Sequence, residues 1–332
     1  IHTENPETIF PDMKFDVIIG NPPYQLSDGG NGASASPLYH RFVRQAQKLK
    51  PRYLTMIIPS RWFGGGKGLD DFRREMLNDN HIRVLVDYEN ASDCFPGVDI
   101  AGGVCYFLWD RDNPGLCDVV NIRNNETMHS VRALNEFDTF IRHDQAASIV
   151  RKVCAFGEPM MSNMVSSRKP FGLPTVARPQ ESGDILLRWQ NGEGPYCRDE
   201  ITVGRELIDK WKVITSYVGY DHAGNPGKDG KRRVFSKIDI LPPGTICTET
   251  YLVVGSFDTE QEAKNLVAYM KTLFFRFLVA QCMYSHHITK EAYRLVPIQD
   301  FSQSWTDEKL YAKYGITDEE IKFIESMVRP ME

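Results

Sequence analysis

The chain has 332 residues, of which 42% are hydrophobic and 25% are charged, and its net charge is −5. These values are typical of an ordinary soluble globular protein of about two domains, and the acidic balance excludes a free-standing basic nucleic-acid binder while still allowing a local basic groove. No apolar run is long enough to span a bilayer, and seven cysteines without any Cys-x-x-Cys spacing argue against a zinc site or a disulfide framework and favour a reducing cytoplasm.

The first half of the chain alternates predicted strands and helices. Branched apolar residues at 15–20 indicate a short buried strand that ends in a glycine turn. Ser36 and Pro37 form a cap and first-turn pair that predicts a helix over residues 37–50. Further strands are predicted at 53–58, 82–88, 103–109 and 117–122, and a further helix at 69–79. The last two strands are candidates to pair with each other, and the alternation is typical of a doubly wound α/β sheet.

The composition of the sequence changes near residues 140–160, where a predicted helix at 144–153 is followed by a stretch rich in proline, glycine and serine. We therefore predict one domain over residues 1–150 and a second, α+β domain over residues 151–332. Short strands are expected in the second domain at 185–190, 213–218, 234–236 and 246–254.

Two capping boxes mark helices near the end of the chain. Thr259 with Glu262 predicts the start of one long helix whose apolar face continues through residue 278. Thr317 with Glu320 predicts a last helix. Ile321, Ile324 and Met327 are its expected core side chains.

The most informative residues follow the first predicted strand and are Asn21, Pro22, Pro23 and Tyr24. Ligands of open α/β sheets bind at this end of the strands. The Asn21 side-chain carbonyl and the Pro22 backbone carbonyl can both accept hydrogen bonds from one amino group, and Pro23 restrains Pro22 toward extended geometry. Tyr24 offers a ring face for a planar base, worth about 1–3 kcal/mol. The pattern indicates a site for the exocyclic amine of a base flipped out of a duplex.

This strand, its glycine and the Asn-Pro-Pro-Tyr sequence resemble the catalytic motif of amino-group methyltransferases that use S-adenosylmethionine. The chain most resembles the N6-adenine DNA methyltransferases of bacterial or archaeal restriction–modification systems, in which a target-recognition domain follows the catalytic domain. The resemblance implies the second half of a doubly wound, Rossmann-like methyltransferase sheet, followed by an α+β target-recognition domain. It also implies site-specific methylation of adenine in double-stranded DNA, with Asn21, Pro22, Pro23 and Tyr24 as the catalytic residues.

Further site residues follow from the resemblance, and each has an alternative in ordinary packing. Leu38 and Phe42, on the first helix, would contact the adenosine of the cofactor or belong to the core. Trp62, after the next strand, would wall the base pocket or pack against the rim of the domain. Phe95, in a Pro-Gly turn, would contact the edge of the extruded base or plug that turn.

Basic residues of the second half are candidates for DNA contacts. They are Lys228, Lys231, Arg232 and Arg233, with Asn225 just before them in a glycine-rich loop, and a weaker cluster of Arg168 and Lys169. Such clusters suit phosphate contacts, and Arg or Asn can read bases in the major groove. The alternative is a solvated hairpin tip. His286 and His287 lack a third ligand at useful spacing, so no metal site is predicted.

The chain has no recognisable glycine-rich loop for the cofactor. Residues 63–68 are rich in glycine, but they lack the acidic surroundings of the family's cofactor loop and are interpreted as an ordinary loop. We therefore expect the main S-adenosylmethionine site to lie in a preceding methyltransferase half or in a partner chain, and this segment alone to be inactive. Without such a partner, the first strand would expose an apolar edge at residues 17–19.

Two other functions stay open at this point. The chain could hold the base and read DNA without catalysing any reaction on its own. Alternatively, it could be a protein-glutamine N5-methyltransferase, because those enzymes resemble it in the Asn-Pro-Pro-Tyr motif. They lack a long domain after the motif, whereas about 300 residues follow it here, enough for a further folded domain. That difference favours DNA as the substrate.

Overall fold

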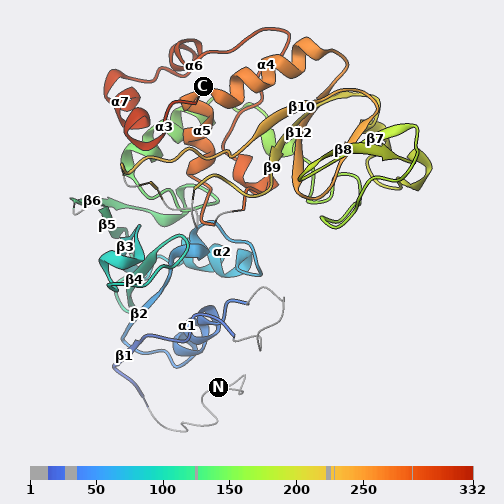
Figure 1. The fold of residues 1–332 in the computed structure, drawn as a ribbon. Coiled ribbons are helices and arrows are strands. Elements are labelled where there is room, and N and C mark those ends of the chain that lie inside the picture. The colour runs from blue at the N-terminus through green and yellow to red at the C-terminus, as the bar shows by residue number, and fades with distance from the viewer. Residues whose placement is uncertain are drawn as a thin grey trace. The chain divides into compact units, whose positions relative to one another are not determined.

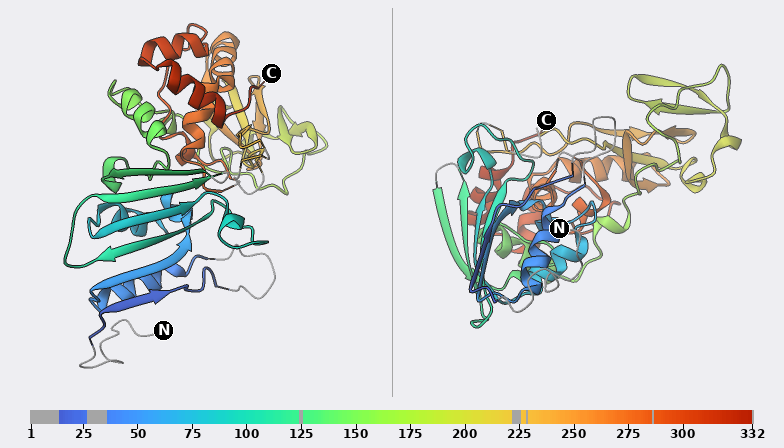
Figure 2. Two further views of the ribbon diagram at one scale, coloured as in Figure 1. Left: turned by 90° about the vertical axis from the view of Figure 1, so that its left-hand side faces the viewer. Right: turned by 90° about the horizontal axis from the view of Figure 1, so that it is seen from below.

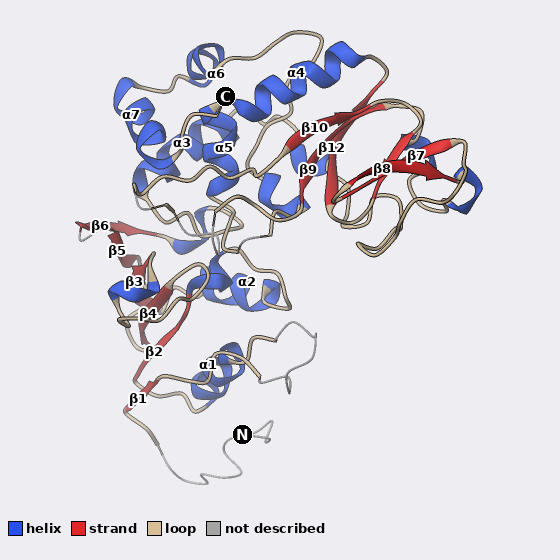
Figure 3. Ribbon diagram, viewed as in Figure 1, coloured by secondary structure: helices blue, strands red, loops and turns tan. Residues whose placement is uncertain are grey.

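The computed structural model describes residues 14–26, 36–123, 126–221, 226–227, 229–285 and 287–331. The chain divides into two units, residues 1–144 and 145–332 (Figure 1). Both units combine helices and strands, so the protein is a mixed α/β protein (Figure 3). In the part of the chain that the structure describes, no helix is both long and apolar enough to cross a membrane.

The first unit is built on a six-stranded mixed sheet (Figure 2). The strand order is β1 (Val17–Gly20), β2 (Tyr53–Pro59), β4 (Val104–Asp110), β3 (Ile82–Tyr88), β5 (Cys117–Arg123) and β6 (Glu126–Arg132). β1 is parallel to β2 and β3 is parallel to β5, whereas β4 and β6 are antiparallel to their neighbours. The strand predicted at residues 82–88 is confirmed with the same bounds.

The sheet differs from a doubly wound parallel sheet at β4. This strand lies antiparallel between β2 and β3, so both of its edges are already paired. The predicted pairing of residues 103–109 with 117–122 is therefore wrong, and β5 pairs with β3 and β6 instead. The connection from β3 to β4 contains the 3₁₀ turn Ala91–Asp93 but no α-helix, and parallel crossovers usually need a helix.

Two helices of the first unit follow the first two strands, α1 (Tyr39–Lys48) after β1 and α2 (Asp70–Asn78) after β2. The start predicted for α1 at Pro37 is wrong, because Pro37 forms an isolated antiparallel β-bridge with Gln25. The buried side chains of α1 are Tyr39, Val43 and Ala46.

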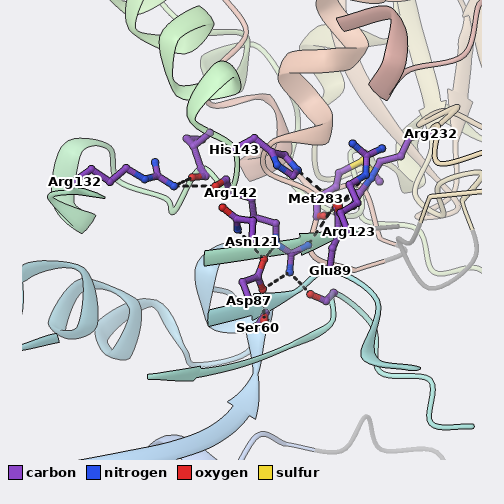
Figure 4. Close-up of polar contacts among 12 residues, drawn as sticks. Ser60, Asp87, Glu89, Asn121, Arg123, Arg132, Arg142, His143, Arg232 and Met283 are labelled. Carbon is purple, nitrogen blue, oxygen red and sulfur yellow. Dashed lines mark hydrogen bonds and ion pairs between the residues drawn. The ribbon is translucent and has the colours of Figure 1, made fainter. Parts of the chain in front are cut away.

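A buried polar network ties the carboxyl ends of β2 and β3 together (Figure 4). The Ser60 hydroxyl donates to Asp87 Oδ1 at 2.8 Å, and the Asn121 side-chain amide donates to Asp87 Oδ2 at 3.4 Å. Arg142 Nε lies 2.8 Å from Asp87 Oδ2, and the two side chains are only 6% and 1% exposed. Because a buried charge is costly unless it is paired, this network fixes the strand ends from which the site loops depart.

The second unit contains two three-stranded sheets and a group of helices. One sheet has the order β10 (Ile238–Leu241), β9 (Trp211–Ser216), β12 (Tyr251–Phe257), and the other β11 (Thr245–Cys247), β7 (Ile185–Trp189), β8 (Gly192–Tyr196). The helices are α3 (Asp144–Cys154), α4 (Glu260–Lys271), α5 (Leu273–Ala280), α6 (Asp307–Tyr314) and α7 (Asp318–Met327). Leu187, Ile214 and Val253 join the two sheets in one apolar core.

Both predicted capping boxes are confirmed, at the starts of α4 and α7. The prediction of a single long helix after Thr259 is wrong, because the helical conformation is interrupted at Thr272 between α4 and α5. Thr272 has extended backbone angles, and its side chain accepts a hydrogen bond from the Phe275 N–H. Asp307, distant in the sequence, accepts from the N–H groups of Leu273 and Phe274 and so satisfies the new helix start.

Two strand predictions for the second unit also need correction. Residues 234–236 form no strand. Residues 246–254 do not form one strand either, because they divide between β11 and β12, which belong to different sheets. Short apolar runs predict buried segments better than they predict pairing, since pairing depends on distant partners.

Candidate active site

The Asn21–Tyr24 segment forms a shelf at the carboxyl end of β1. Because β1 and β2 are parallel, the shelf leaves the sheet beside the carboxyl end of β2. Asn21 and Pro23 are exposed, Pro22 is buried, and Tyr24 is half-buried. The Asn21 side chain is therefore accessible to a ligand.

Backbone hydrogen bonds fasten the shelf to the chain just before α1. The Leu38 N–H donates to the Tyr24 carbonyl at 3.0 Å, and the Leu26 N–H donates to the Ser36 carbonyl at 3.1 Å. These bonds make residues 24–26 one side of a short antiparallel pairing. The position of the Tyr24 ring is thus set by the backbone on which it sits.

A pocket of about 770 Å³ adjoins the shelf and lies entirely within the first unit. All four residues of Asn21–Tyr24 line it. Other parts of its wall come from Tyr39 at the start of α1, Pro59 at the end of β2 and residues 99–101 before β4. Its volume falls in the range of about 300–1,000 Å³ that is typical of pockets for drug-sized ligands.

The two tyrosines of the pocket stay protonated near neutral pH. Burial raises the pKa of Tyr24 to about 12, with smaller contributions from Cys94 and Cys105. Burial also raises the pKa of Tyr39 well above its ordinary value. The hydroxyl oxygen of Tyr24 is itself buried, so Tyr24 offers the pocket a ring surface rather than a base.

The predicted base-pocket residues Trp62 and Phe95 do not line this pocket. Trp62 is fully buried, with its ring centroid 4.7 Å from that of Phe63 and 6.0 Å from that of Phe72. The expectation that Trp62 walls the pocket is therefore wrong, because its side chain belongs to the core. Phe95 is half-buried and lies outside the lining, although residues 99–101 of the same loop belong to it.

Leu38 and Phe42, predicted to contact the cofactor, are both half-buried. Neither belongs to the buried face of α1 or to the lining of the pocket. Their side chains therefore keep accessible surface, and their role stays a prediction.

Sequence reasoning missed two cations of the pocket lining, Arg61 and Lys67. Arg61 lies in the 3₁₀ turn Ser60–Phe63 directly after β2, and Lys67 lies in the glycine-rich loop that follows. The available signal was the position of this loop, because it follows the carboxyl end of a strand next to β1, where ligands of α/β sheets bind.

Arg168 and Lys169, the weaker basic cluster, both face Glu249. Arg168 Nε lies 3.2 Å and Lys169 Nζ lies 3.8 Å from Glu249 Oε2. The Arg168 guanidinium also lies 4.7 Å from the centre of the Tyr217 ring. Glu249 therefore compensates one of the two positive charges of this cluster within the unit.

The stronger basic cluster is only partly accessible. Arg232 is 4% exposed and donates to the Met283 carbonyl at 3.2 Å, so it cannot reach a phosphate from this conformation and the DNA contact predicted for it is wrong (Figure 4). Lys231 and Arg233 are half-buried, and the Arg233 guanidinium lies 4.6 Å from the centre of the Tyr220 ring. Asn225, Lys228 and His286 lie outside the described residues.

Within the described ranges, no group of three or more His, Cys, Asp or Glu side chains is arranged to hold a metal ion.

Fold and site together define a mixed α/β protein with a ligand pocket at the carboxyl ends of β1 and β2. Residues 2–95 match the family model described as Eco57I restriction-modification methylase. A curated relative, an "uncharacterized adenine-specific methylase" of Mycoplasma pneumoniae (strain ATCC 29342 / M129), is 45% identical over 114 residues, which are 33% of this chain and 26% of the relative. The chain thus spans about a quarter of the length of the curated relative that it matches.

Weaker likenesses extend over more of the chain. The type IIL restriction-modification enzyme MmeI in complex with DNA aligns at 8% identity and a TM-score of 0.42, covering 85% of this chain and 45% of that one. The type IIG restriction endonuclease BpuSI aligns at 9% identity and a TM-score of 0.35, covering 91% and 49%.

Proposed function

We propose that this chain forms the base-holding and DNA-reading part of an S-adenosylmethionine-dependent N6-adenine DNA methyltransferase of a restriction–modification system. The observation that carries the proposal is the Asn21–Tyr24 shelf, which lines a pocket of about 770 Å³ at the end of β1. The shelf lies inside the residues that match a restriction-modification methylase family. The name of the Mycoplasma relative, an adenine-specific methylase, supports adenine as the base.

In this proposal, the N6 amino group of adenine donates hydrogen bonds to the Asn21 side-chain carbonyl and to the Pro22 backbone carbonyl. The two bonds draw the nitrogen lone pair out of conjugation with the ring and direct it toward the methyl donor. Tyr24 stacks on the base, which contributes about 1–3 kcal/mol. The adenine has to leave the duplex to reach the shelf.

The contribution of these residues is positioning and electrostatics. Bound S-adenosylmethionine supplies the electrophilic methyl group. The adenine amine would take this methyl group as the donor's carbon–sulfur bond breaks, and the displaced amine proton would pass to solvent. Tyr24 does not take up that proton, since burial raises its pKa to about 12 and keeps its hydroxyl protonated.

Leu38 and Phe42 are proposed to pack against the adenosine of the cofactor, because both are half-buried and keep accessible apolar surface, and the Leu38 N–H bonds to the Tyr24 carbonyl. The main cofactor loop is placed outside these 332 residues, in a methyltransferase half or a partner chain that pairs with β1. Support comes from β1 itself, which is an edge strand of the described sheet with Val17 49% and Ile19 76% exposed. An apolar edge of this kind favours pairing with a further strand.

The second unit is proposed to read the DNA target. Lys231 and Arg233 keep partial exposure and are the candidates for phosphate or base contacts among the described residues. Asn225 and Lys228 lie outside the described residues, and their DNA contacts stay a prediction from the sequence. Arg168 and Lys169 would contribute only if DNA phosphates compete with Glu249 for them.

The proposed chemistry is tested by Asn21→Ala in the active methyltransferase, meaning this chain together with the cofactor-binding half. The variant loses one of the two acceptors for the amine, and methyl transfer to DNA should fall by roughly 10²–10³-fold or more. DNA affinity should not change, because the shelf acts after the base has left the duplex. Radiolabel transfer and mobility-shift assays measure the two quantities.

The matched control is Asn113→Ala, which truncates the same amide on an exposed loop outside the pocket lining. It should leave methyl transfer unchanged. Unchanged turnover in Asn21→Ala would refute the assignment. If the enzyme transferred methyl groups to a glutamine side chain in a peptide but not to DNA, glutamine and not adenine would be its substrate.

The exposed edge of β1 favours a second, narrower function, in which this chain alone holds base and DNA without transferring methyl groups. Calorimetric titration with S-adenosylmethionine tests whether the chain alone binds the cofactor or only holds the base and the DNA. Tight binding by the chain alone would contradict the placement of the cofactor loop elsewhere.

A further inference from the structure

Two cationic side chains share the pocket with the Asn21–Tyr24 shelf. They are Arg61, in the turn after β2, and Lys67, in the loop that leads to α2. Partial burial, and then the charge of Arg61, lowers the pKa of Lys67, so the two cations lie close enough to repel each other. Asp99 is the acidic group among the described lining residues. The described lining therefore carries more positive than negative charge, although the chain as a whole carries −5.

The loop that carries Lys67 has an unusual backbone. Gly65, Gly66 and Gly68 have positive φ angles of 75°, 76° and 79°, and Lys67 between them has a φ of 50°. A non-glycine residue in this left-handed region costs about 1–2 kcal/mol. Strain of this kind concentrates at functional sites, and here it falls on the lysine that lines the pocket.

The first turn of α2 holds this loop in place. The Gly66 N–H donates to Asp70 Oδ1 at 3.1 Å, and Arg73 Nη1 donates to the Gly64 carbonyl at 2.6 Å. A Cβ atom on Gly65 would collide with the Asp70 and Arg73 side chains. Because α2 anchors the loop backbone at these points, the position of Lys67 beside the pocket is part of the fold.

We propose that Arg61 and Lys67 form a phosphate subsite that holds the DNA backbone next to the extruded adenine. The inference rests on the proposed function, because a flipped nucleotide stays bonded to its flanking phosphates and brings them to the pocket with the base. Arginine binds phosphate through its planar fork, and lysine binds it as a point charge. The subsite fixes the backbone of the target nucleotide and thereby the approach of its amine to Asn21.

The competing anion is a carboxylate, such as the one in the amino-acid part of the cofactor. Charge alone does not separate the two, so the test removes the charge from the DNA as well as from the protein. Lys67 is the residue to change, because it is exposed on a loop and its replacement leaves the core intact.

The experiment combines Lys67→Gln with a duplex in which the phosphate on one side of the target adenine is replaced by an uncharged methylphosphonate. The target site is mapped beforehand from DNA that the active methyltransferase has modified, and each flanking phosphate is replaced in turn. For one of the two positions, Lys67→Gln and the methylphosphonate should each lower kcat/KM for DNA by roughly tenfold. Together they should lower it little further, because both remove the same contact.

Salt dependence provides a readout that a merely structural role of Lys67 would not change. Loss of one phosphate contact should reduce the slope of log affinity against log salt concentration by about 0.9. Lys67→Arg should restore most of the activity. Lys48→Gln, which removes the same charge from an exposed site at the end of α1, should change neither quantity.

Fully additive losses from Lys67→Gln and the methylphosphonate at both positions would overturn the phosphate subsite. So would a raised KM for S-adenosylmethionine with an unchanged salt slope, because that result assigns Lys67 to a cofactor carboxylate. In both cases methylation of adenine by the native enzyme would still stand. Failure of the native enzyme to methylate DNA would instead refute the proposed function.

Discussion

Replacing Arg142 by methionine tests how the first unit holds the strand ends that carry the pocket. Arg142 Nε lies 2.8 Å from Asp87 Oδ2, and the side chains are 6% and 1% exposed. Methionine keeps an unbranched side chain but removes the cation, so the Asp87 carboxylate stays buried without its closest opposite charge. Removing one partner of a buried ion pair costs about 3–5 kcal/mol. Ser60 and Asn121 still donate hydrogen bonds to Asp87, so we expect a loss near the lower end, about 3 kcal/mol.

The loss should shrink as the pH falls. Burial raises the pKa of Asp87, and the charge of Arg142 opposes that rise. In Arg142→Met the opposing charge is gone, so the pKa of Asp87 in the folded variant lies still further above the unfolded value of 3.8. A carboxyl group with a raised folded pKa binds its proton more tightly in the folded state. The variant therefore regains stability as the pH falls through that raised value toward 3.8.

Urea unfolding at neutral and mildly acidic pH measures the free energy of unfolding, and hydrogen exchange of β2 and β3 shows whether the loss is local. The control is the double variant Asp87→Asn with Arg142→Met, which removes both charges and should be more stable than the single variant. A loss below about 1 kcal/mol in Arg142→Met, or a double variant less stable than the single one, would refute the reasoning.

Ile19→Lys should reduce self-association of this chain in sedimentation experiments, because Ile19 is 76% exposed on the edge strand β1 and a lysine there discourages strand pairing. Leu186→Lys, at an exposed position of the second unit, should not have this effect; equal effects of the two would contradict pairing through β1. Lys212 is fully buried, and burial lowers its pKa from 10.5 to about 8. Between these values the unfolded state binds more protons, so native stability relative to Lys212→Met should rise with pH, by about 3 kcal/mol at 1.36 kcal/mol for each pKa unit. A difference that stays constant over this pH range in denaturation experiments would contradict the depressed pKa.

Local signals predicted those elements whose ends are set by residues close in sequence. The capping boxes at Thr259 and Thr317 are confirmed, because each joins residues only three positions apart. The break at Thr272 escaped prediction, because the residue that satisfies the new helix start is Asp307 on another helix. The antiparallel insertion of β4 escaped for the same reason, since strand pairing is decided by partners distant in the chain.

The candidate site shows the same limit at the scale of single side chains. Trp62 and Arg61 are neighbours in sequence, yet Trp62 enters the core and Arg61 lines the pocket. Both lie in the 3₁₀ turn that begins at Ser60, whose N–H donates to the carbonyl of Gly103 at 3.0 Å. A Cβ atom on Gly103 would collide with the backbone of Tyr88, so the orientation of this turn depends on a close approach of two distant segments. The sequence around Trp62 does not indicate that Gly103 and Tyr88 come together. The chemistry of Asn21–Tyr24, by contrast, depends on four consecutive residues and could be predicted directly.

An acidic protein that binds DNA has to concentrate positive charge locally where the phosphates arrive. Many cations of this protein are paired internally, such as Arg168 with Glu249 at 3.2 Å and Arg329 with Asp229 at 2.7 Å. If the chain binds DNA as proposed, few phosphate contacts would determine the salt dependence of binding, because each contact contributes about 0.9 to the slope of log affinity against log salt concentration. Loss of the Lys67 contact would then remove a large fraction of the slope of log affinity against log salt concentration. The same loss would be harder to detect in a uniformly basic protein, because more phosphate contacts contribute to its slope.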